Sequence, residues 1–107
     1  MTILELDTMK RPGARIHAKR KGARGEYKTR RRLESAGYTV IKAGGSLGCF
    51  DLIALGAVDI RAVQVKVNGY VGKVERAAML AVVLPPNAQR EIWRWIDHQR
   101  EPLIELL

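Results

Sequence analysis

The chain has 107 residues, of which 47% are hydrophobic and 28% are charged, and its net charge at pH 7 is +8. This length fits one domain, and this apolar content predicts a folded chain rather than a disordered one. No apolar run approaches the ~20 residues that span a bilayer, and the N-terminus lacks the apolar block of a signal peptide. The single cysteine, Cys49, excludes an internal disulfide framework and a cysteine-based zinc site, so we expect a reducing, intracellular setting.

The excess positive charge lies entirely in the first two-fifths of the chain. Residues 1–42 hold twelve Lys and Arg against four acidic residues, whereas residues 43–107 hold seven of each. Localised positive charge is typical of a protein that binds a polyanion, most often nucleic acid. Ribosomal proteins, proteins that bind anionic membranes and merely soluble basic domains share this property, so charge alone leaves these alternatives open.

The basic segment at the start of the chain is followed by a predicted helix. Residues 1–20 have weak periodicity and a Pro-Gly pair, so we expect a mobile or partly strand-forming basic arm there. A helix is predicted over residues 23–36, with Gly37 as its C-terminal cap. Glu26 borders its apolar stripe, which is predicted to consist of Ala23, Tyr27, Leu33 and Ala36.

Strands dominate the rest of the chain. Runs rich in β-branched and aromatic residues predict strands over residues 38–43, 50–55, 60–67, 90–97 and 103–107. The second and third of these should form a hairpin, and a glycine-rich loop over residues 44–48 precedes it. Residues 90–97 also fit a helix by spacing, but their composition favours a strand. A short helix is predicted over residues 75–82, ended by Pro85-Pro86.

Two of the strands carry the residues most suited to chemistry. Alternation along residues 60–67 directs Val63, Val65 and Val67 to one face and Gln64 and Lys66 to the other. Asp51 stands in an apolar strand, where a carboxylate costs free energy unless it is paired or metal-bound. Acidic groups and a lysine that meet at the edge of a small sheet suit divalent-metal-assisted cleavage of a phosphodiester.

Each candidate residue has a chemical role in such a reaction. Asp51 would be the central ligand of the cation, and Glu26 would hold the same ion directly or through water. The Gln64 side chain offers a neutral carbonyl oxygen as a weaker ligand. Lys66 would orient the attacking water and stabilise charge on the phosphate oxygens. Ser46, in the glycine-rich loop, would approach the scissile phosphate.

The same residues also have purely structural interpretations. A Gln-x-Lys pattern in a strand is most often a solvated face. Asp51 could form a salt bridge with an arginine of the helix, and Glu26 could pair with Arg30 one turn further on. The glycine-rich loop could be a simple hairpin connection. The combination of these features in this order is what favours the chemical interpretation.

The order of these motifs resembles the PD-(D/E)xK nuclease superfamily and, more narrowly, the archaeal-type Holliday junction resolvases, found also in some phages. The resemblance covers about residues 19–67. The matching stretches are residues 21–26, 41–46, 50–54 and 63–66.

The resemblance implies an α/β fold with a restriction-endonuclease-like core, in which helices flank a mixed sheet of about five strands. It implies one nuclease domain over residues 21–107, preceded by the arm. Magnesium, or manganese in its place, would be held by Glu26, Asp51 and Gln64 with help from the Val65 carbonyl, and Lys66 and Ser46 would complete the site. The residues expected to hold DNA phosphates are Arg15, Lys19, Arg20, Lys21, Arg24, Lys28 and Arg31.

The assembly and location follow from the same resemblance. Such resolvases are two-fold homodimers that nick a four-way junction at two symmetric points. The location would be the cytoplasm of a prokaryote, or of the host cell for a viral protein. Candidates for the dimer face, with ordinary core as the alternative, are Met79, Leu80, Trp93, Trp95 and residues 103–107.

The chain departs from the family pattern at three places. Gln64 stands where the resolvases usually have glutamate, which removes one negative charge and predicts weaker metal binding. Phe50 replaces the proline of the motif. The loop between Ser46 and Asp51 is short. Two other functions therefore stay open: a nicking or repair nuclease that acts on flaps or duplex, and a non-catalytic nucleic-acid-binding protein on the same scaffold.

Overall fold

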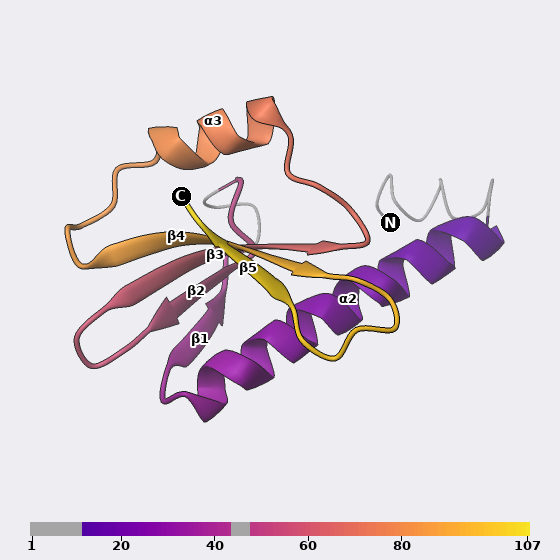
Figure 1. Cartoon of the computed structure of the whole chain (residues 1–107), viewed down its shortest axis with the longest axis horizontal. Helices are drawn as coiled ribbons and strands as arrows, with labels where there is room; N and C mark the ends of the chain where they lie inside the picture. Colours follow the sequence, from indigo (N-terminus) through magenta and orange to yellow (C-terminus); the bar gives the residue numbers. More distant parts are fainter. Residues whose placement is uncertain (1–11, 44–47) are drawn as a thin grey trace.

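Strand β3 (Ile60–Val67) is the central strand of a five-stranded sheet with the order β1-β2-β3-β4-β5 (Figure 1). The computed structural model describes residues 12–43 and 48–107, with the side chains described from residue 22 onward. The other strands are β1 (Thr39–Lys42), β2 (Leu52–Leu55), β4 (Ala88–Trp95) and β5 (Leu103–Leu106). Only the β3–β4 pair is parallel among these, so the sheet is mixed, as predicted.

The two described helices lie on opposite faces of the sheet, with α2 (Pro12–Ser35) below it and α3 (Lys73–Ala81) above it in Figure 1. Helix α3 lies in the connection between β3 and β4, because two parallel neighbours need a crossover rather than a tight turn. The architecture is therefore the predicted α/β arrangement of a mixed sheet flanked by helices.

Helix α2 begins well before the predicted residue 23. Pro12 is its first residue, a position that proline favours because the first helical N–H has no partner inside the helix. Residues 12–20 are therefore helical, so the expectation of a partly strand-forming arm is wrong there. The predicted boundary between arm and domain at residues 20 and 21 falls inside this helix, and residues 1–11 lie outside the described part.

The C-terminus of α2 was predicted correctly. Gly37 has φ 97°, and its N–H donates to Glu34 O at 3.0 Å. The N–H of Tyr38 donates to Leu33 O, also at 3.0 Å. This pair of bonds is the Schellman arrangement, which needs a left-handed residue after the helix and therefore favours glycine.

The buried face of α2 differs from the predicted apolar stripe. Its buried residues from position 22 onward are Gly25, Thr29 and Leu33, one turn apart, whereas Ala23, Tyr27 and Ala36 are exposed. A Cβ on Gly25 would stand 2.5 Å from Val67 Cγ2, so the helix approaches the sheet more closely there than a larger residue allows. Thr29 Oγ1 donates to Gly25 O and accepts a bond from Trp95 Nε1, each at 2.8 Å. Small and hydroxyl-bearing residues therefore make this contact.

Two core clusters confirm the predicted alternation along β3. Below the sheet, Val63 and Val65 pack with Leu33 of α2, and Val67 packs against the same cluster. Above the sheet, Ala62 packs with Met79 of α3. Because residues of one parity share a face of a strand, Gln64 and Lys66 belong to the α3 side.

The last part of the chain was also predicted well. Residues 88–95 form a strand, which decides between the helix and strand interpretations of the predicted segment 90–97. Three of the dimer-face candidates, Met79, Trp93 and Trp95, are core residues with exposed fractions of 0, 4 and 5%, so their assignment to a dimer face is wrong. Leu80, Leu103, Ile104 and Leu106 are exposed.

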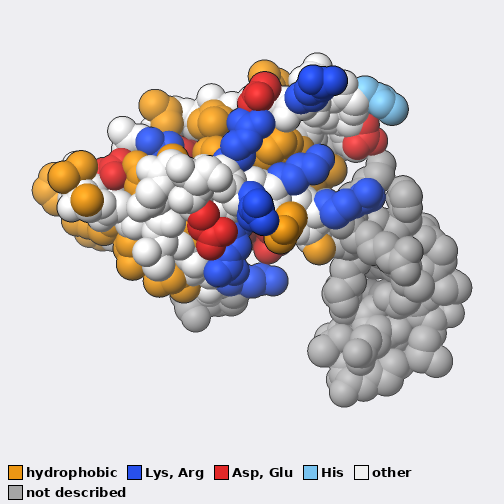
Figure 2. All heavy atoms as spheres, turned by 90° about the horizontal axis from the view of Figure 1, so that it is seen from below, with side chains coloured by type: hydrophobic (Ala, Val, Ile, Leu, Met, Phe, Trp, Pro, Cys, Tyr) orange, Lys and Arg blue, Asp and Glu red, His pale blue; other side chains and the backbone are white. Residues whose placement is uncertain are grey.

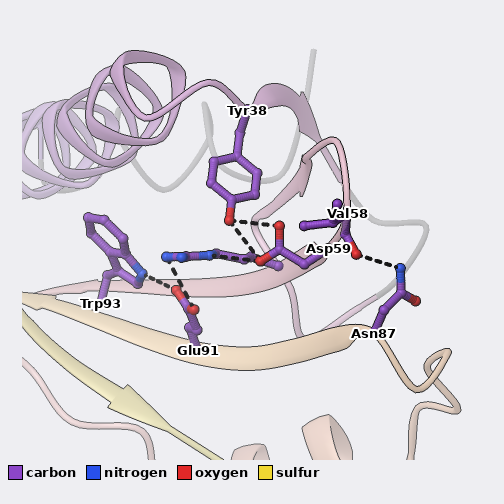
Figure 3. Close-up of polar contacts among 7 residues, drawn as sticks. Tyr38, Val58, Asp59, Asn87, Glu91 and Trp93 are labelled. Carbon is purple, nitrogen blue, oxygen red and sulfur yellow. Dashed lines mark hydrogen bonds and ion pairs between the residues drawn. The ribbon is translucent and has the colours of Figure 1, made fainter.

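A polar network links β4 to the starts of β1 and β3 (Figure 3). Glu91 is 1% exposed and accepts a bond from Trp93 Nε1 at 2.9 Å, and its other oxygen lies 3.5 Å from Arg61 Nη1. Tyr38 Oη donates to the Asp59 carboxylate, and the Arg61 guanidinium lies over the Tyr38 ring. We assign this network to folding, because each acid in it is already paired within the chain.

No helix in the described part of the chain combines the length and the apolar character that crossing a membrane requires.

Candidate active site

Asp51 stands directly before β2 and is anchored to the central strand β3. Its N–H donates to Val63 O at 2.8 Å, and its side-chain Oδ2 accepts a bond from the Val65 N–H, also at 2.8 Å. None of the salt bridges between described residues involves this carboxylate, so the alternative of a salt bridge to an arginine of α2 does not hold among them. The residue before it, Phe50, is 1% exposed, so an aromatic core residue occupies the place of the motif proline.

Burial raises the pKa of Asp51 above its ordinary value. The bond from the Val65 N–H and the charges of Lys66 and Lys42 act in the opposite direction, but they do not outweigh the burial. The carboxylate is thus held partly away from water without full compensation of its charge. A cation beside it would stabilise its ionised form.

Gln64 and Lys66 stand on the α3 side of β3. The Gln64 side chain is only 8% exposed, and no hydrogen bond joins it to another residue of the described part. Lys66 Nζ lies 3.0 Å from Oε2 of Glu75, a residue in the first turn of α3. The Lys66 ammonium therefore stands between two acids, Glu75 and Asp51, and its charge acts on both.

Glu26 projects from α2 toward the β1 end of the sheet. Its Oε1 lies 3.6 Å from Lys42 Nζ, and its side chain is 30% exposed. The predicted alternative of an i,i+4 pair with Arg30 is wrong, because Arg30 pairs with Glu34 instead. Glu26 and Lys42 line one open pocket of about 420 Å³, together with Leu52 of β2.

Lys42 and Lys66 both act on the predicted metal ligands Glu26 and Asp51, Lys42 by pairing with Glu26 and both lysines by their charge at Asp51. Lys42 pairs with Glu26, and its charge also acts on Asp51. Lys66 continues this alternation of charges from Asp51 to Glu75. No direct bond joins Glu26 to Asp51 among the described residues. Lys42 and Lys66 thus pair with acids of different elements, Glu26 of α2 and Glu75 of α3.

A hard divalent cation needs oxygen ligands, and the site offers a small set of them. Among the described residues no three or more His, Cys, Asp or Glu side chains form a group that could hold a metal ion. The oxygen donors present are the carboxylates of Asp51 and Glu26, the Gln64 amide oxygen and the Val65 carbonyl. Oxygen donors with remaining positions left to water suit magnesium, which keeps several waters when bound. The incompletely compensated Asp51 carboxylate and the Gln64 amide, which bonds to no described residue, fit such an ion.

The predicted DNA-binding residues all fall on α2. Arg15, Lys19, Arg20 and Lys21 lie in its N-terminal half, where only the backbone is described, and Arg24, Lys28 and Arg31 are exposed. Ser46 lies outside the described residues. Figure 2 shows Lys and Arg side chains gathered in a broad group on the lower face of the molecule.

Part of this basic surface is a groove that the sequence did not predict. It has a volume of about 660 Å³ and lies between the C-terminal half of α2 and the segment after β4. Lys28 Nζ lies 5.3 Å from the centre of the Trp95 ring, and the Arg32 guanidinium lies 5.9 Å from it. Arg100 lines the opposite wall.

The sequence did not single out four residues of these surfaces, since each has its place only through contacts between distant elements. They are Lys42, Glu75, Arg32 and Arg100.

The chain therefore has a mixed α/β fold. Candidate site residues Asp51, Gln64 and Lys66 lie on or beside its central strands, and the basic helix α2 crosses one face of the sheet. Such a fold is found in Hjc, a Holliday junction resolvase from the archaeal hyperthermophile Archaeoglobus fulgidus, whose structure has been solved at 1.6 Å resolution. The likeness covers 81% of this chain and 71% of that chain, with a TM-score of 0.65 and 20% sequence identity. At this identity the comparison shows a shared fold. No family model and no curated protein matches the sequence.

Proposed function

We propose that the chain is a magnesium-dependent endonuclease that resolves four-way DNA junctions by paired symmetric nicks. The observation that carries the proposal is the Asp51 carboxylate, bonded to the Val65 N–H and subject to the charges of Lys42 and Lys66. This arrangement occurs in a fold that the chain shares with an archaeal Holliday junction resolvase. Manganese would substitute for magnesium, because both accept oxygen donors.

Each residue of the proposed site has a separate role in cation binding or in phosphodiester cleavage. Asp51, Glu26, Gln64 and the Val65 carbonyl would hold the cation, which would neutralise charge on the phosphodiester and activate water when bound. Lys66 orients the attacking water and stabilises negative charge on the phosphate oxygens. The Val65 N–H fixes the rotamer of Asp51 through the 2.8 Å bond to Oδ2, so the other oxygen of that carboxylate is free of this bond.

Binding of the junction is assigned to the basic surface of α2. Lys and Arg side chains contact DNA phosphates without reading bases, so selection would follow the shape of the branch rather than its sequence. Paired symmetric cuts need two active sites related by a two-fold axis, which favours a homodimer. The dimer-face candidates that the structure leaves accessible are Leu80 of α3 and the β5 residues Leu103, Ile104 and Leu106.

One observation favours a second function. Gln64 provides no charge, and no three-acid group forms among the described residues. A non-catalytic protein that binds branched nucleic acid on the same scaffold would need the basic surface but not a complete metal site.

A nuclease that acts on flaps or duplex would share every residue of the site, so only the substrate distinguishes it from a resolvase.

A junction-cleavage assay distinguishes these functions. Four-way junctions with end-labelled arms would be incubated with the chain, with and without magnesium, beside linear duplex and a flap. Paired nicks at symmetric positions that need magnesium support resolution, whereas equal cutting of linear duplex contradicts it. Binding of junctions without any nicking would support the binding protein.

Asp51→Asn is the variant that tests the site in the same assay. Asparagine keeps an oxygen that accepts the Val65 N–H bond and removes the charge, so the fold should persist while nicking falls by about 100-fold or more. The matched control is Glu34→Gln, which neutralises an exposed acid paired with Arg30 near the end of α2. Magnesium-dependent nicking that survives Asp51→Asn would place the active site elsewhere.

A further inference from the structure

Position 64 leaves β3 without an acidic group at the candidate metal site. Gln64 offers a neutral oxygen where the resolvases that the chain resembles usually have glutamate. The Gln64 side chain is 8% exposed, and none of the hydrogen bonds between described residues reaches it. No described residue therefore competes with a ligand for the Gln64 amide oxygen.

Glu75 brings a carboxylate to the same face of the sheet from a different element. It stands in the first turn of α3, and α3 packs through Met79 on the face of β3 that also carries Gln64 and Lys66. Glu75 Oε2 lies 3.0 Å from Lys66 Nζ. Asp51 is bonded to the N–H of Val65, the residue before Lys66 in β3. Two acids from separate elements therefore flank one lysine.

The accessibility of this pair suits an incoming cation. The side chain of Lys66 is 29% exposed and that of Glu75 is 44% exposed. Ion pairs at this degree of exposure are weakly held, because water screens the charges and two long side chains lose freedom. A divalent cation would therefore compete effectively with the Lys66 ammonium for the Glu75 carboxylate.

We propose that Glu75 supplies the second strong carboxylate ligand of the divalent-cation site, in place of an acid at position 64. This inference rests on the proposed function, because it adds a ligand to that same site. The ion pair with Lys66 keeps the Glu75 carboxylate near Asp51 before a cation binds. When Glu75 turns to the cation, Lys66 becomes available to the phosphate.

Two ordinary explanations of the Lys66–Glu75 pair make different predictions. As a surface ion pair it would contribute nothing to cation binding. As a device that positions Lys66, Glu75 would affect catalysis, and its removal would act on the site only through the lysine. Lys66→Met separates these cases, because methionine keeps most of the side-chain length but neither pairs with Glu75 nor carries charge.

The experiment measures Mn²⁺ binding to the purified chain without DNA, by calorimetry and by the electron paramagnetic resonance signal of free Mn²⁺. Glu75→Gln is expected to weaken the affinity by about tenfold or more, in the range seen when a metal site loses a supporting group. In Glu75→Gln combined with Gln64→Glu, the acid returns to β3 and the affinity should recover to near the parent value. Lys66→Met should retain or increase the affinity, since it frees the Glu75 carboxylate.

The controls keep failure of this inference apart from failure of the proposed function. Glu34→Gln should bind Mn²⁺ as the parent does, and Asp51→Asn should lose binding. Parent-like affinity in Glu75→Gln, with binding lost in Asp51→Asn, would overturn the role of Glu75 and leave the metal site intact. A loss in Lys66→Met equal to that in Glu75→Gln would also overturn it, because Glu75 would then act through the lysine. A parent chain that binds no Mn²⁺ would overturn both proposals.

Discussion

At the scale of single residues, the site depends on charges that only partly compensate one another. The Asp51 carboxylate keeps a raised pKa although an N–H bond and two lysines favour its ionised form. Lys42 and Lys66 each pair with a second acid, Glu26 and Glu75 respectively. Burial and the negative charge of Glu75 therefore oppose the effect of the two lysines on Asp51.

At Lys66 we expect a substitution to reduce the rate of junction cleavage without weakening the binding of the junction. Lys66→Met removes the ammonium that would act on the phosphate, so junction nicking should fall by about 100-fold or more. Junction affinity should change little, because the basic side chains of α2 outnumber this one charge. Single-turnover nicking and a gel-shift titration without magnesium measure the two quantities. Affinity that falls as steeply as nicking would show that Lys66 is a binding residue.

Glu91 is a buried acid whose loss should destabilise the fold. It is 1% exposed and holds both Trp93 Nε1 and the Arg61 guanidinium. Glu91→Ala would leave Trp93 Nε1 without its acceptor and Arg61 with its contact to Asp59 alone, and a buried donor left unsatisfied costs about 1–3 kcal/mol of the free energy of unfolding. Urea denaturation measures the loss. Glu105→Ala, at a more exposed pair with Arg76, is the control and should cost about 1 kcal/mol or less.

At the scale of elements, the strands could be predicted because their signals are local. Alternating valines and the tight connection around residues 56–59 predict the β2–β3 hairpin, and the composition of residues 88–95 predicts β4. The face of α2 could not be predicted, because Gly25 and Thr29 are not apolar and are buried only through contacts with Val67 and Trp95. Apolar periodicity does not detect a helix that packs closely through small residues.

The two glycines of α2 test this close packing as a matched pair. A Cβ on Gly22 would meet no atom within 4 Å, whereas one on Gly25 would stand 2.5 Å from Val67 Cγ2. Gly22→Ala should raise the free energy of unfolding by about 0.5–1 kcal/mol, because alanine is the better helix former. Gly25→Ala gains the same propensity but must push helix from sheet, so it should be destabilising by about 1–2 kcal/mol net. Equal effects in thermal denaturation would show that α2 lies further from the sheet.

The candidate site shows the same limit of prediction. Asp51, Gln64 and Lys66 were predicted from their place on two neighbouring strands. Lys42 and Glu75 were not, because their roles depend on side chains that reach across from β1 and α3. A sequence pattern reports what one strand presents, and pairs between elements appear only after folding.

At the scale of the whole molecule, the positive charge concentrated in the first part of the sequence lies mainly on one element, helix α2. The seven residues expected to hold phosphates all lie on α2, and Arg32 and Arg100 extend the basic surface into the groove beside Trp95. None of the salt bridges between described residues involves Lys28, Arg31 or Arg100. These charges are therefore available to a polyanion.

The dependence of junction affinity on salt should reveal this surface. The logarithm of the association constant should fall linearly with the logarithm of salt concentration, with a slope of roughly −0.9 for each phosphate contacted. Lys28→Ala combined with Arg31→Ala should make the slope shallower by about 2 for two lost contacts. Val58→Ala combined with Val83→Ala, at exposed apolar positions, is the control and should leave the slope unchanged. A parent slope near zero would contradict an electrostatic grip on the backbone.

One continuous helix carries both Glu26 and the basic residues on either side of it. A helix of 24 residues is about 36 Å long at 1.5 Å per residue, so these groups keep fixed spacings along a single rod. The rise of the helix would then fix the distance between a bound phosphate and the scissile bond. One residue inserted between Arg24 and Lys28 would turn one half of the rod by about 100° against the other, and grip and cut would no longer address the same strand.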